Sequence, residues 1–345
     1  MNQPGLTEFL EYVAQGKHLT TSQAEAAFDR FMDGTASEIQ MAGLLVGMRA
    51  KGLASSEIAG GVRALRSAMN SVSASAPDTL VDTAGTGGGA ITTFNISTTA
   101  AFVVAGAGLC VAKHGNRAAT SQSGSADVLE AAGINLALSA EQIATMIEQV
   151  GVGFMFAPAH HSAMKHVIAA RKEIGVRTVF NILGPLTNPA AAPNQIIGVF
   201  DPQWIPILLE VLRDLGSDHV LIVAAEDGLD EMSIAAATAV GELRGGEIYS
   251  YTVSPADFGI KQYANYDELK IDSAEASLTL MRQALTYENK AAGDIVALNA
   301  GAAIFAANLE DSLLNGVKRA QEVLISGAAL AKLDELVQCS NSMSE

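Results

Sequence analysis

Glycines dominate the segment GTGGG at residues 85–89, which follows the apolar run LVDTA and precedes ISTTAAFVVAGAG, a run with the composition of a helix. Because glycine lacks a Cβ, such a loop can bring backbone N–H groups close to a phosphate, and the positive end of the following helix adds to the attraction. The loop differs from two common nucleotide-binding loops, since no lysine follows the glycines and the spacing G-x-G-x-x-G is absent. Taken alone, the segment fits a phosphate site and a tight strand–helix turn equally well.

A second polar segment, KHGNR at residues 113–117, follows the next apolar run. Lys113 and Arg117 could neutralise a phosphate, and the amide of Asn116 can both donate and accept hydrogen bonds. A solvated basic loop would also explain this segment if it stood alone. In open α/β sheets, however, ligands bind at the carboxyl ends of strands. Two such loops on neighbouring strand ends therefore favour a ribose-phosphate pocket.

Two carboxylates, Asp230 and Glu231, follow the apolar run HVLIVAA after a short loop. Mg²⁺ usually takes one or two protein carboxylates and completes its shell with water and substrate phosphates, so this pair is a candidate metal site. Carboxylate pairs are also common on protein surfaces. We interpret the neighbouring Glu226 and Asp227 as ordinary loop charges.

A fourth segment carries the adjacent residues His160 and His161, followed by Arg171. Adjacent histidines point in different directions and lack the i, i+4 spacing of a helical metal pair, so packing or a polar contact explains them better than a metal. Arg171 is expected on the same helix as His161. Its planar guanidinium could hold a carboxylate there, or it could pair on the surface.

The elements that position these segments begin with a helical region. The first 70 or so residues are interpreted as helices only. Capping boxes are predicted at Ser22–Glu25 and Thr35–Glu38, and the second helix has an apolar stripe that includes Ile39 and Leu44. The polar stretch NSVSASAPDT then marks a domain boundary.

Beyond this boundary, short apolar runs alternate with helical segments, which predicts a mostly parallel sheet flanked by helices. The fold class is therefore α/β, with a small all-helical domain and a larger α/β domain. We expect the helical domain at residues 1–72, joined by a helical segment at about 161–187, and the α/β domain at residues 73–160 and 188–345.

The chain is strongly acidic, with 21 Lys and Arg residues against 37 Asp and Glu residues and a formal net charge of −16. Binding to nucleic acid or anionic membranes relies on cationic neutralisation of phosphates, so neither partner is expected. The segment MNQPGLTEFLEYVAQG lacks the pattern of a secretion signal, and the longest uncharged apolar run is too short to span a bilayer. With only 2 cysteines and no zinc-ligand spacing, the sequence predicts a cytoplasmic protein.

Together these segments resemble the anthranilate phosphoribosyltransferase family of tryptophan biosynthesis. The likeness runs in order along essentially the whole chain, through GTGG, NIST, KHGNR, SGSADVLEAAG, RKEIGVRTVFNILGPLTNP and DGLDE. KHGNR and GPLTNP are its most specific parts. The resemblance implies a magnesium-dependent enzyme that joins anthranilate to 5-phosphoribosyl 1-pyrophosphate (PRPP), inverts the anomeric carbon and releases pyrophosphate. It also implies a homodimer formed through the helical domain.

The resemblance assigns residues of this chain to each ligand. PRPP would bind to Gly85, Thr86, Gly87, Gly88, Thr93, Asn95, Ser97, Thr98, Lys113 and Ser125. Anthranilate would contact Gly85, His114, Asn116, His161, Arg171, Gly184 and Pro185, with the arginine facing its carboxylate. Two Mg²⁺ ions would be held by Ser97, Asp230 and Glu231. No covalent nucleophile or strong base is expected, because positioning and charge stabilisation carry such a reaction.

One position departs from the family pattern. Gly89 stands where aspartate usually follows GTGG, which removes a carboxylate from the neighbourhood of the phosphates. We expect this difference to alter the dependence on Mg²⁺ and the closure of the loop, but not the overall reaction.

Two other functions fit parts of the sequence. A pyrimidine nucleoside phosphorylase has the same architecture, but it uses inorganic phosphate and needs no carboxylate pair opposite a pyrophosphate loop, so DGLDE and KHGNR favour the transferase. A non-catalytic relative that binds nucleotide or nucleic acid is disfavoured by the complete motifs. The net charge of −16 also disfavours nucleic acid.

Overall fold

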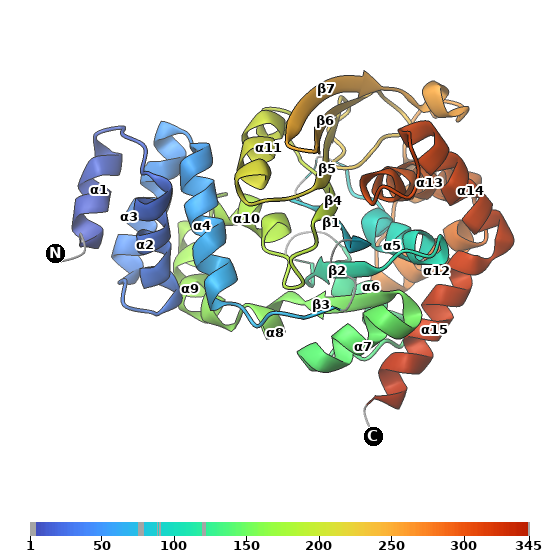
Figure 1. Cartoon of the computed structure of the whole chain (residues 1–345), viewed down its shortest axis with the longest axis horizontal. Helices are drawn as coiled ribbons and strands as arrows, with labels where there is room; N and C mark the ends of the chain where they lie inside the picture. The colour runs from blue at the N-terminus through green and yellow to red at the C-terminus, as the bar shows by residue number, and fades with distance from the viewer. Residues whose placement is uncertain (1–4, 75–78, 88, 90, 119–121, 344–345) are drawn as a thin grey trace.

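The computed structural model describes residues 5–74, 79–87, 89, 91–118 and 122–343. Its first helices are α1 (Leu6–Ala14), α2 (Thr21–Met32), α3 (Glu38–Lys51) and α4 (Ser55–Ala68). They form the bundle at the left of Figure 1, beside α9 (Lys165–Ile174) and α10 (Phe180–Leu186). Side chains of α2, α4, α9 and α10 share one buried apolar cluster, in which the ring centroids of Phe28 and Phe180 are 5.7 Å apart. The chain therefore returns to this bundle long after leaving it.

The starts of α2 and α3 differ from the sequence prediction. Thr20 and Gln23 form the capping box of α2, and Ser37 and Gln40 form that of α3. The predicted boxes are wrong: Ser22–Glu25 and Thr35–Glu38. Glutamine completes a capping box as glutamate does, so a search for glutamate alone misplaced both helix starts.

Ile39 is a second correction. It was predicted in the apolar stripe of α3, but its side chain is 85% exposed, whereas Leu44, Leu45 and Met48 are buried. At 100° per residue, Ile39 lies about 140° around the helix from Leu44, so it cannot share the same face.

The larger part of the molecule is built on a seven-stranded sheet in the order β3-β2-β1-β4-β5-β6-β7 (Figure 1). The pairs from β3 to β5 are parallel, and the last two pairs are antiparallel. The mostly parallel sheet is therefore confirmed. The strands are β1 (Val81–Gly85), β2 (Val111–Gly115), β3 (Val152–Phe156), β4 (Asn194–Gly198), β5 (His219–Ala225), β6 (Thr238–Arg244) and β7 (Glu247–Val253).

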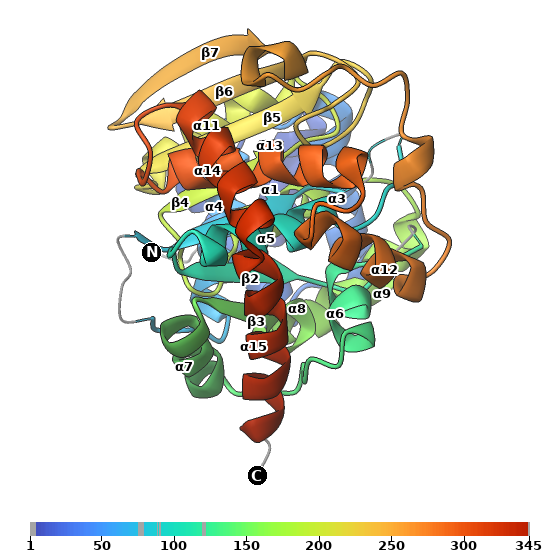
Figure 2. The same ribbon diagram turned by 90° about the vertical axis from the view of Figure 1, so that its right-hand side faces the viewer.

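Helices cover both faces of this sheet. In β5, Leu221 and Val223 point into one apolar cluster while Ile222 and Ala224 point into the other, as the alternation of strand side chains requires. A layer of helices covers the first cluster. Figure 2 views this layer from outside, with α15 in front of α5. That layer contains α5 (Ile96–Gly106), α12 (Ala274–Leu285), α13 (Lys290–Ala306), α14 (Leu313–Ser326) and α15 (Ala328–Ser342), with α6 (Ser125–Ala131) and α7 (Ala140–Val150) nearer β3.

The opposite face packs against α11 (Trp204–Asp214) and, through it, against α4 of the bundle. A short helix, α8 (Ala157–His160), follows β3 and leads the chain back towards the bundle (Figure 1). Because the strands from β3 to β5 are parallel, their carboxyl ends lie at the same edge of the sheet as the end of β3. The polar segments that follow these strands therefore lie at the edge nearest the bundle (Figure 1). No helix in the described part of the chain is long and apolar enough to cross a membrane.

Candidate active site

The glycine-rich loop leaves the carboxyl end of β1. Gly85 pairs with Gly198 of β4, and the N–H of Thr86 donates to the carbonyl oxygen of Gly198 at 2.9 Å. Gly87 has a φ of 65°, which side-chain-bearing residues rarely adopt, so glycine is favoured there. Gly88 lies outside the described residues. The loop thus holds its backbone close to the end of the neighbouring strand before the chain enters α5.

The candidate metal ligands, Asp230 and Glu231, lie on the loop between β5 and β6. The carboxylate of Glu231 accepts hydrogen bonds from the N–H and hydroxyl of Ser97, and that of Asp230 accepts one from the N–H of Gly87. Burial, together with the charge of Asp230, raises the pKa of Glu231 to about 8, against the opposing effect of Lys113. Burial also raises the pKa of Asp230. Segments far apart in the sequence therefore meet at this pair.

The donor set at this pair fits Mg²⁺. Two carboxylates and the hydroxyl of Ser97 offer hard oxygen ligands, which this ion prefers. Two like charges held together out of water are costly, and a divalent cation would offset both. Across the described ranges, no group of three or more His, Cys, Asp or Glu side chains could hold a metal. Water and phosphate oxygens would therefore have to complete the coordination shell.

Two glycines make room for the carboxylate loop. A Cβ on Gly198 would lie 1.7 Å from the carbonyl oxygen of Asp230, so any side chain there would push the loop away from β4. A Cβ on Gly89 would lie 2.8 Å from Asp230 Oδ1 and 3.1 Å from the carbonyl oxygen of Gly228. The residue that departs from the family pattern is thus in direct contact with a candidate metal ligand.

Lys113 is buried beneath this edge of the sheet, near Asp82. Its Nζ donates to the carbonyl oxygens of Thr83 and His114, while the carboxylate of Asp82 accepts bonds from Asn188 at 2.7 Å and from the N–H of His114 at 3.3 Å. Burial lowers the pKa of Lys113 and raises that of Asp82, and each group partly offsets the effect on the other. Two backbone carbonyl oxygens thus hold the lysine head group, and the nearby charge of Asp82 favours its protonated form.

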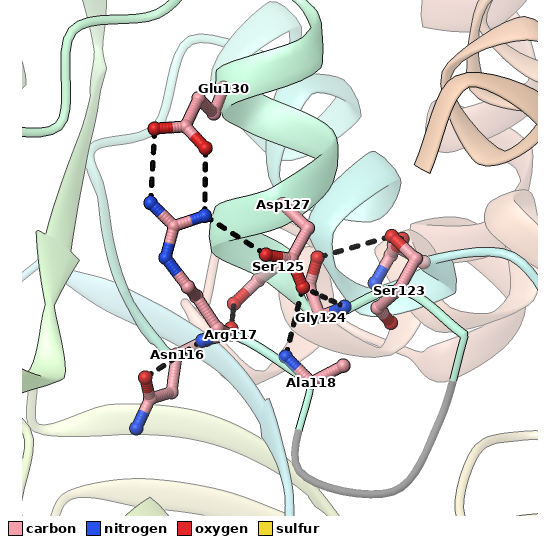
Figure 3. Close-up of polar contacts among 9 residues, drawn as sticks. Asn116, Arg117, Ala118, Ser123, Gly124, Ser125, Asp127 and Glu130 are labelled. Atoms are coloured by element: carbon pink, nitrogen blue, oxygen red, sulfur yellow. Dashed lines mark hydrogen bonds and ion pairs between the residues drawn. The ribbon is translucent and has the colours of Figure 1, made fainter. Parts of the chain in front are cut away.

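The segment after β2 folds back on the start of α6 (Figure 3). Ser125 donates to the carbonyl oxygen of Asn116 at 3.1 Å, and a Cβ on Gly115 would lie 2.0 Å from Ser125 Oγ. The Arg117 guanidinium makes a two-pronged contact with Glu130, at 2.7 and 3.0 Å, and reaches Asp127 at 3.1 Å. Arg117, which the sequence offered as a phosphate ligand, therefore has carboxylate partners in this structure.

The side chain of Asn95 joins the start of α5 to the segment just before α6 and to α12. Its Oδ1 accepts hydrogen bonds from Ser123 Oγ at 2.9 Å and from Ser277 Oγ at 2.7 Å, and its Nδ2 donates to the carbonyl oxygen of Ser123 at 3.2 Å. The backbone N–H of Asn95 donates to Ser277 Oγ as well, at 3.2 Å. Ser277 belongs to α12 and is fully buried. One asparagine thus ties the start of α5, the segment just before α6 and α12 together.

A pair of histidines lies between the sheet and the bundle. The ring centroids of His114 and His161 are 5.1 Å apart; the His114 ring bonds to the carbonyl oxygen of Gly184 and the His161 ring to that of Thr187. Burial, with nearby histidines, lowers the pKa of His161 to about 4 and that of His114 well below its usual value. Both rings are therefore neutral at neutral pH, and their buried Nε2 atoms have no partner in the described structure.

Arg171 lies on α9 and stacks over Phe180 of α10, with its guanidinium carbon 5.1 Å from the ring centroid. Burial lowers its pKa, although arginine still stays protonated. Among the described residues, no carboxylate pairs with it. The prediction that it shares a helix with His161 is wrong, because α8 ends at His160 and a short 3₁₀ turn separates it from α9.

Comparison with known proteins decides which family this site belongs to. The family model for the α/β domain of the glycosyl transferase family matches residues 77–330, and the model for its helical bundle domain matches residues 7–69. The chain is 53% identical to the anthranilate phosphoribosyltransferase of Methylococcus capsulatus, covering 97% of this chain and 98% of that protein. It is 52% identical to the enzyme of the same name from Hahella chejuensis, covering 96% and 97%. This chain belongs to the anthranilate phosphoribosyltransferase family.

Solved structures of anthranilate phosphoribosyltransferases share the fold. The crystal structure from Thermus thermophilus has a TM-score of 0.90 and 40% identity, covering 96% of this chain and 99% of that one. The Saccharomyces cerevisiae enzyme in complex with PRPP and Mg has a TM-score of 0.88 at 24% identity, covering 98% of both chains, which is a likeness of fold. The resemblance and the fold class predicted from the sequence are both confirmed.

The remaining candidate residues lie on the same elements of this anthranilate phosphoribosyltransferase fold. Thr93 precedes α5 and donates to the carbonyl oxygen of Phe94, Thr98 is buried in α5, and Pro185 is buried in α10 beside Gly184. The ligand that each candidate residue binds stays a prediction.

Four residues of the site were missed by the sequence reasoning: Asp82, Asn188, Ser277 and Gly198. Asp82 lies inside an apolar strand segment, which is an unusual place for a carboxylate and was its available signal. Gly198 interrupts an apolar strand, which often marks a close backbone approach. Ser277 had no such signal, because its partners are more than 150 residues away, as the separation of 182 positions from Asn95 shows.

Proposed function

We propose that this chain transfers the 5-phosphoribosyl group of PRPP to the amine of anthranilate, releasing pyrophosphate, in tryptophan biosynthesis. The observation that carries the proposal is the pair of contacts from Asp230 to Gly87 and from Glu231 to Ser97. These contacts join a carboxylate pair suited to a divalent cation with a loop suited to an anion. Full-length relatives of about this chain's size, at 53% and 52% identity, carry the same activity in their names.

The phosphate end of the site would stabilise the leaving group. The positive end of α5 would favour the charge that develops on pyrophosphate, while the N–H groups of Thr86 and Gly87 hold the loop to Gly198 and Asp230. Mg²⁺ held by Asp230, Glu231 and Ser97 would add positive charge beside the same oxygens. Lys113, held by the carbonyl oxygens of Thr83 and His114 and favoured in its charged form by Asp82, would contribute a further buried positive charge.

The acceptor end would hold anthranilate by its carboxylate and its ring. Arg171 offers a guanidinium with no acidic partner among the described residues, and a planar fork of this kind suits a carboxylate. His114 and His161 are neutral, so they add no competing charge near the amine. The amine nitrogen would bond to the anomeric carbon as the bond to pyrophosphate breaks, with the electron pair leaving on pyrophosphate. The nitrogen then loses one proton.

We further propose that two Mg²⁺ ions bind in each site. Asp230 and Glu231 are adjacent, but they face different partners, the glycine loop for one and Ser97 for the other. This divergence leaves room for one ion near each carboxylate. A cytoplasmic location stays a prediction of the sequence.

A homodimer through the helical bundle is also proposed. Exposed apolar side chains occur on α1, α3 and α9, and α3 packs against the other two helices. These side chains are Tyr12, Ile39, Val46 and Ile168, which are 38%, 85%, 43% and 57% exposed. Apolar surface of this kind on one unit often marks an interface. Ile39→Glu should convert a dimer to a monomer in sedimentation or light-scattering measurements. Ile325→Glu, on the 73% exposed isoleucine of α14, should leave the dimer intact, and equal behaviour of the two variants would contradict the assigned interface.

The activity is tested by following anthranilate fluorescence over time with PRPP, with and without Mg²⁺. Loss of signal only when the protein, PRPP and Mg²⁺ are all present supports the reaction and the metal requirement together. A flat trace from folded protein across a range of Mg²⁺ would rule out anthranilate as the acceptor. A parallel assay with thymidine and phosphate tests the phosphorylase alternative, since release of thymine would favour that enzyme.

A further inference from the structure

Helix α13 is buried along almost its whole length, and its side chains are mainly apolar. Residues from Ala291 to Ala306 are all buried, which makes a polar side chain inside the helix unusual. Asn299 is such a residue, with only 1% of its surface exposed. A buried amide is costly unless its donors and acceptor are satisfied, so its partners show what the residue does.

The partner of Asn299 is the backbone of Met232, directly after Glu231. Oδ1 of Asn299 accepts a hydrogen bond from the N–H of Met232 at 2.8 Å, and Nδ2 donates to the carbonyl oxygen of Met232 at 3.1 Å. The second hydrogen of Nδ2 goes to the carbonyl oxygen of Ile295 at 2.9 Å, one turn back in α13. The amide thus holds both polar groups of one residue, as a neighbouring strand would.

This contact controls the direction of Glu231. The N–H of Met232 belongs to the peptide unit that joins it to Glu231, so fixing both polar groups of Met232 fixes the orientation of that unit. Met232 is itself 1% exposed, so water cannot replace the lost bonds. The rest of the loop is held separately, by Asp227, which accepts bonds from Ser233 at 3.0 Å and from Tyr266.

We infer that Asn299 is a positioning residue for the metal-binding pair, holding Glu231 so that its carboxylate meets Ser97 and faces the ion. This role rests on the proposed function, because it assumes that Asp230 and Glu231 bind Mg²⁺. Asn299 touches neither substrate nor metal and acts through the backbone of Met232. Residues that orient metal ligands in this way commonly change metal affinity when they are replaced.

The test uses full-length Asn299→Leu, which keeps a side chain of similar size but makes no hydrogen bond, and Asn299→Ser as a smaller second variant. Calorimetry measures Mg²⁺ binding in the presence of pyrophosphate, and steady-state rates give the KM of each substrate. We expect Mg²⁺ binding to weaken by about 10- to 100-fold in both variants. The KM of anthranilate should change by less than about twofold, because Arg171 and the histidines lie on other elements.

Leu298→Ala is the matched control, since it removes buried side-chain volume from the same helix without removing a hydrogen bond to the loop. A lower melting temperature with unchanged Mg²⁺ affinity in this control, beside weakened Mg²⁺ binding in the asparagine variants, supports the inference. Unchanged Mg²⁺ affinity in a folded asparagine variant, or an equal loss in the control, overturns it. Wild-type protein that binds no Mg²⁺ with pyrophosphate would instead overturn the proposed function itself.

Discussion

Arg171 has a partly buried, positively charged head group and no carboxylate partner among the described residues. Holding an arginine there without an acidic partner costs free energy, and a bound carboxylate would offset that cost. Arg171→Ala should therefore raise the KM of anthranilate about 10- to 100-fold, the range expected for charge-assisted hydrogen bonds worth 1.5–3 kcal/mol. The KM of PRPP should change by less than about threefold, because the phosphate end is built from other elements. Steady-state titration of each substrate measures both values.

Arg171→Lys is the control for charge. Lysine keeps the positive charge but cannot offer two parallel N–H donors, so its KM for anthranilate should fall between those of the wild type and the alanine variant. Equal changes in the two KM values of Arg171→Ala would contradict the assignment of this residue to the acceptor.

A side chain at position 89 would lie against Asp230, so substitutions of Gly89 test how added charge changes the candidate metal site. Gly89→Asp would place a third carboxylate beside the pair, where Gly89→Asn would place a neutral group of the same size. Both must displace the Asp230 side chain by a few tenths of an ångström, since the Cβ would lie 2.8 Å from Oδ1. The added charge should lower the Mg²⁺ concentration at half-maximal rate in the aspartate variant relative to the asparagine variant. Matching Mg²⁺ titrations for the two variants would mean that the family difference does not act through charge.

Helix α12 contributes Ser277, whose hydroxyl oxygen accepts from the N–H of Asn95 and donates to its Oδ1. Removing this hydroxyl leaves the N–H of Asn95 without an acceptor and its Oδ1 with one donor fewer. The Asn95 side chain is then held less firmly against Ser123. Ser277→Ala should therefore raise the KM of PRPP several-fold, with little change in the KM of anthranilate. Saturation curves for both substrates, recorded at one temperature below the melting transition, provide the measurement.

Ser273→Ala is the matched control for this element. Ser273 caps the same helix by accepting a bond from the N–H of Ala276, and loss of a cap costs about 1 kcal/mol of stability. It has no bond to Asn95. A similar rise in the KM of PRPP in both variants would show that general loosening of α12, rather than the Ser277 contact, is responsible.

Elements with a strong local pattern were predicted well. The strand at His219–Ala225 is apolar after its first residue and was placed at its observed bounds, and the α5 region was recognised from its composition. The hairpin of β6 and β7 was not predicted. Its outer strand, Glu247–Val253, is an edge strand with many exposed polar residues, so it carries no continuous apolar run. A sheet edge of this kind is defined by pairing with a neighbour rather than by its own sequence.

The residues of the site also divide into those that a local motif predicts and those that only the folded chain brings together. Residues in short contiguous motifs, such as Gly85 to Gly87 or Asp230 with Glu231, could be proposed from the sequence because each motif has its own chemistry. The residues that support them could not, since Asn299 reaches Met232 across 67 positions and Asn188 reaches Asp82 across 106. Only the folded chain brings such pairs together.

Across the whole molecule, stability should depend on pH through two partly buried histidines, His114 and His161. His161 has its pKa lowered to about 4 by burial, and that of His114 is lowered well below its usual value. In the unfolded chain both titrate near their ordinary value of about 6.5. Below that pH the unfolded chain binds protons that the folded chain does not, so the free energy of unfolding falls as pH is lowered from 6.5 towards 4.

His161→Gln isolates this effect, because glutamine can still donate to the carbonyl oxygen of Thr187 but takes up no proton. Urea unfolding of the wild type and the variant at pH 7.5, 6.5, 5.5 and 4.5 gives the difference between their free energies of unfolding. Above pH 6.5 that difference should be constant, since the imidazole is neutral in both states. Below it, the wild type should lose stability relative to the variant by up to about 1.4 kcal/mol per pH unit. Parallel pH curves for the two proteins would mean that folding does not lower the pKa of His161, which would remove the support for the neutral acceptor pocket proposed for anthranilate.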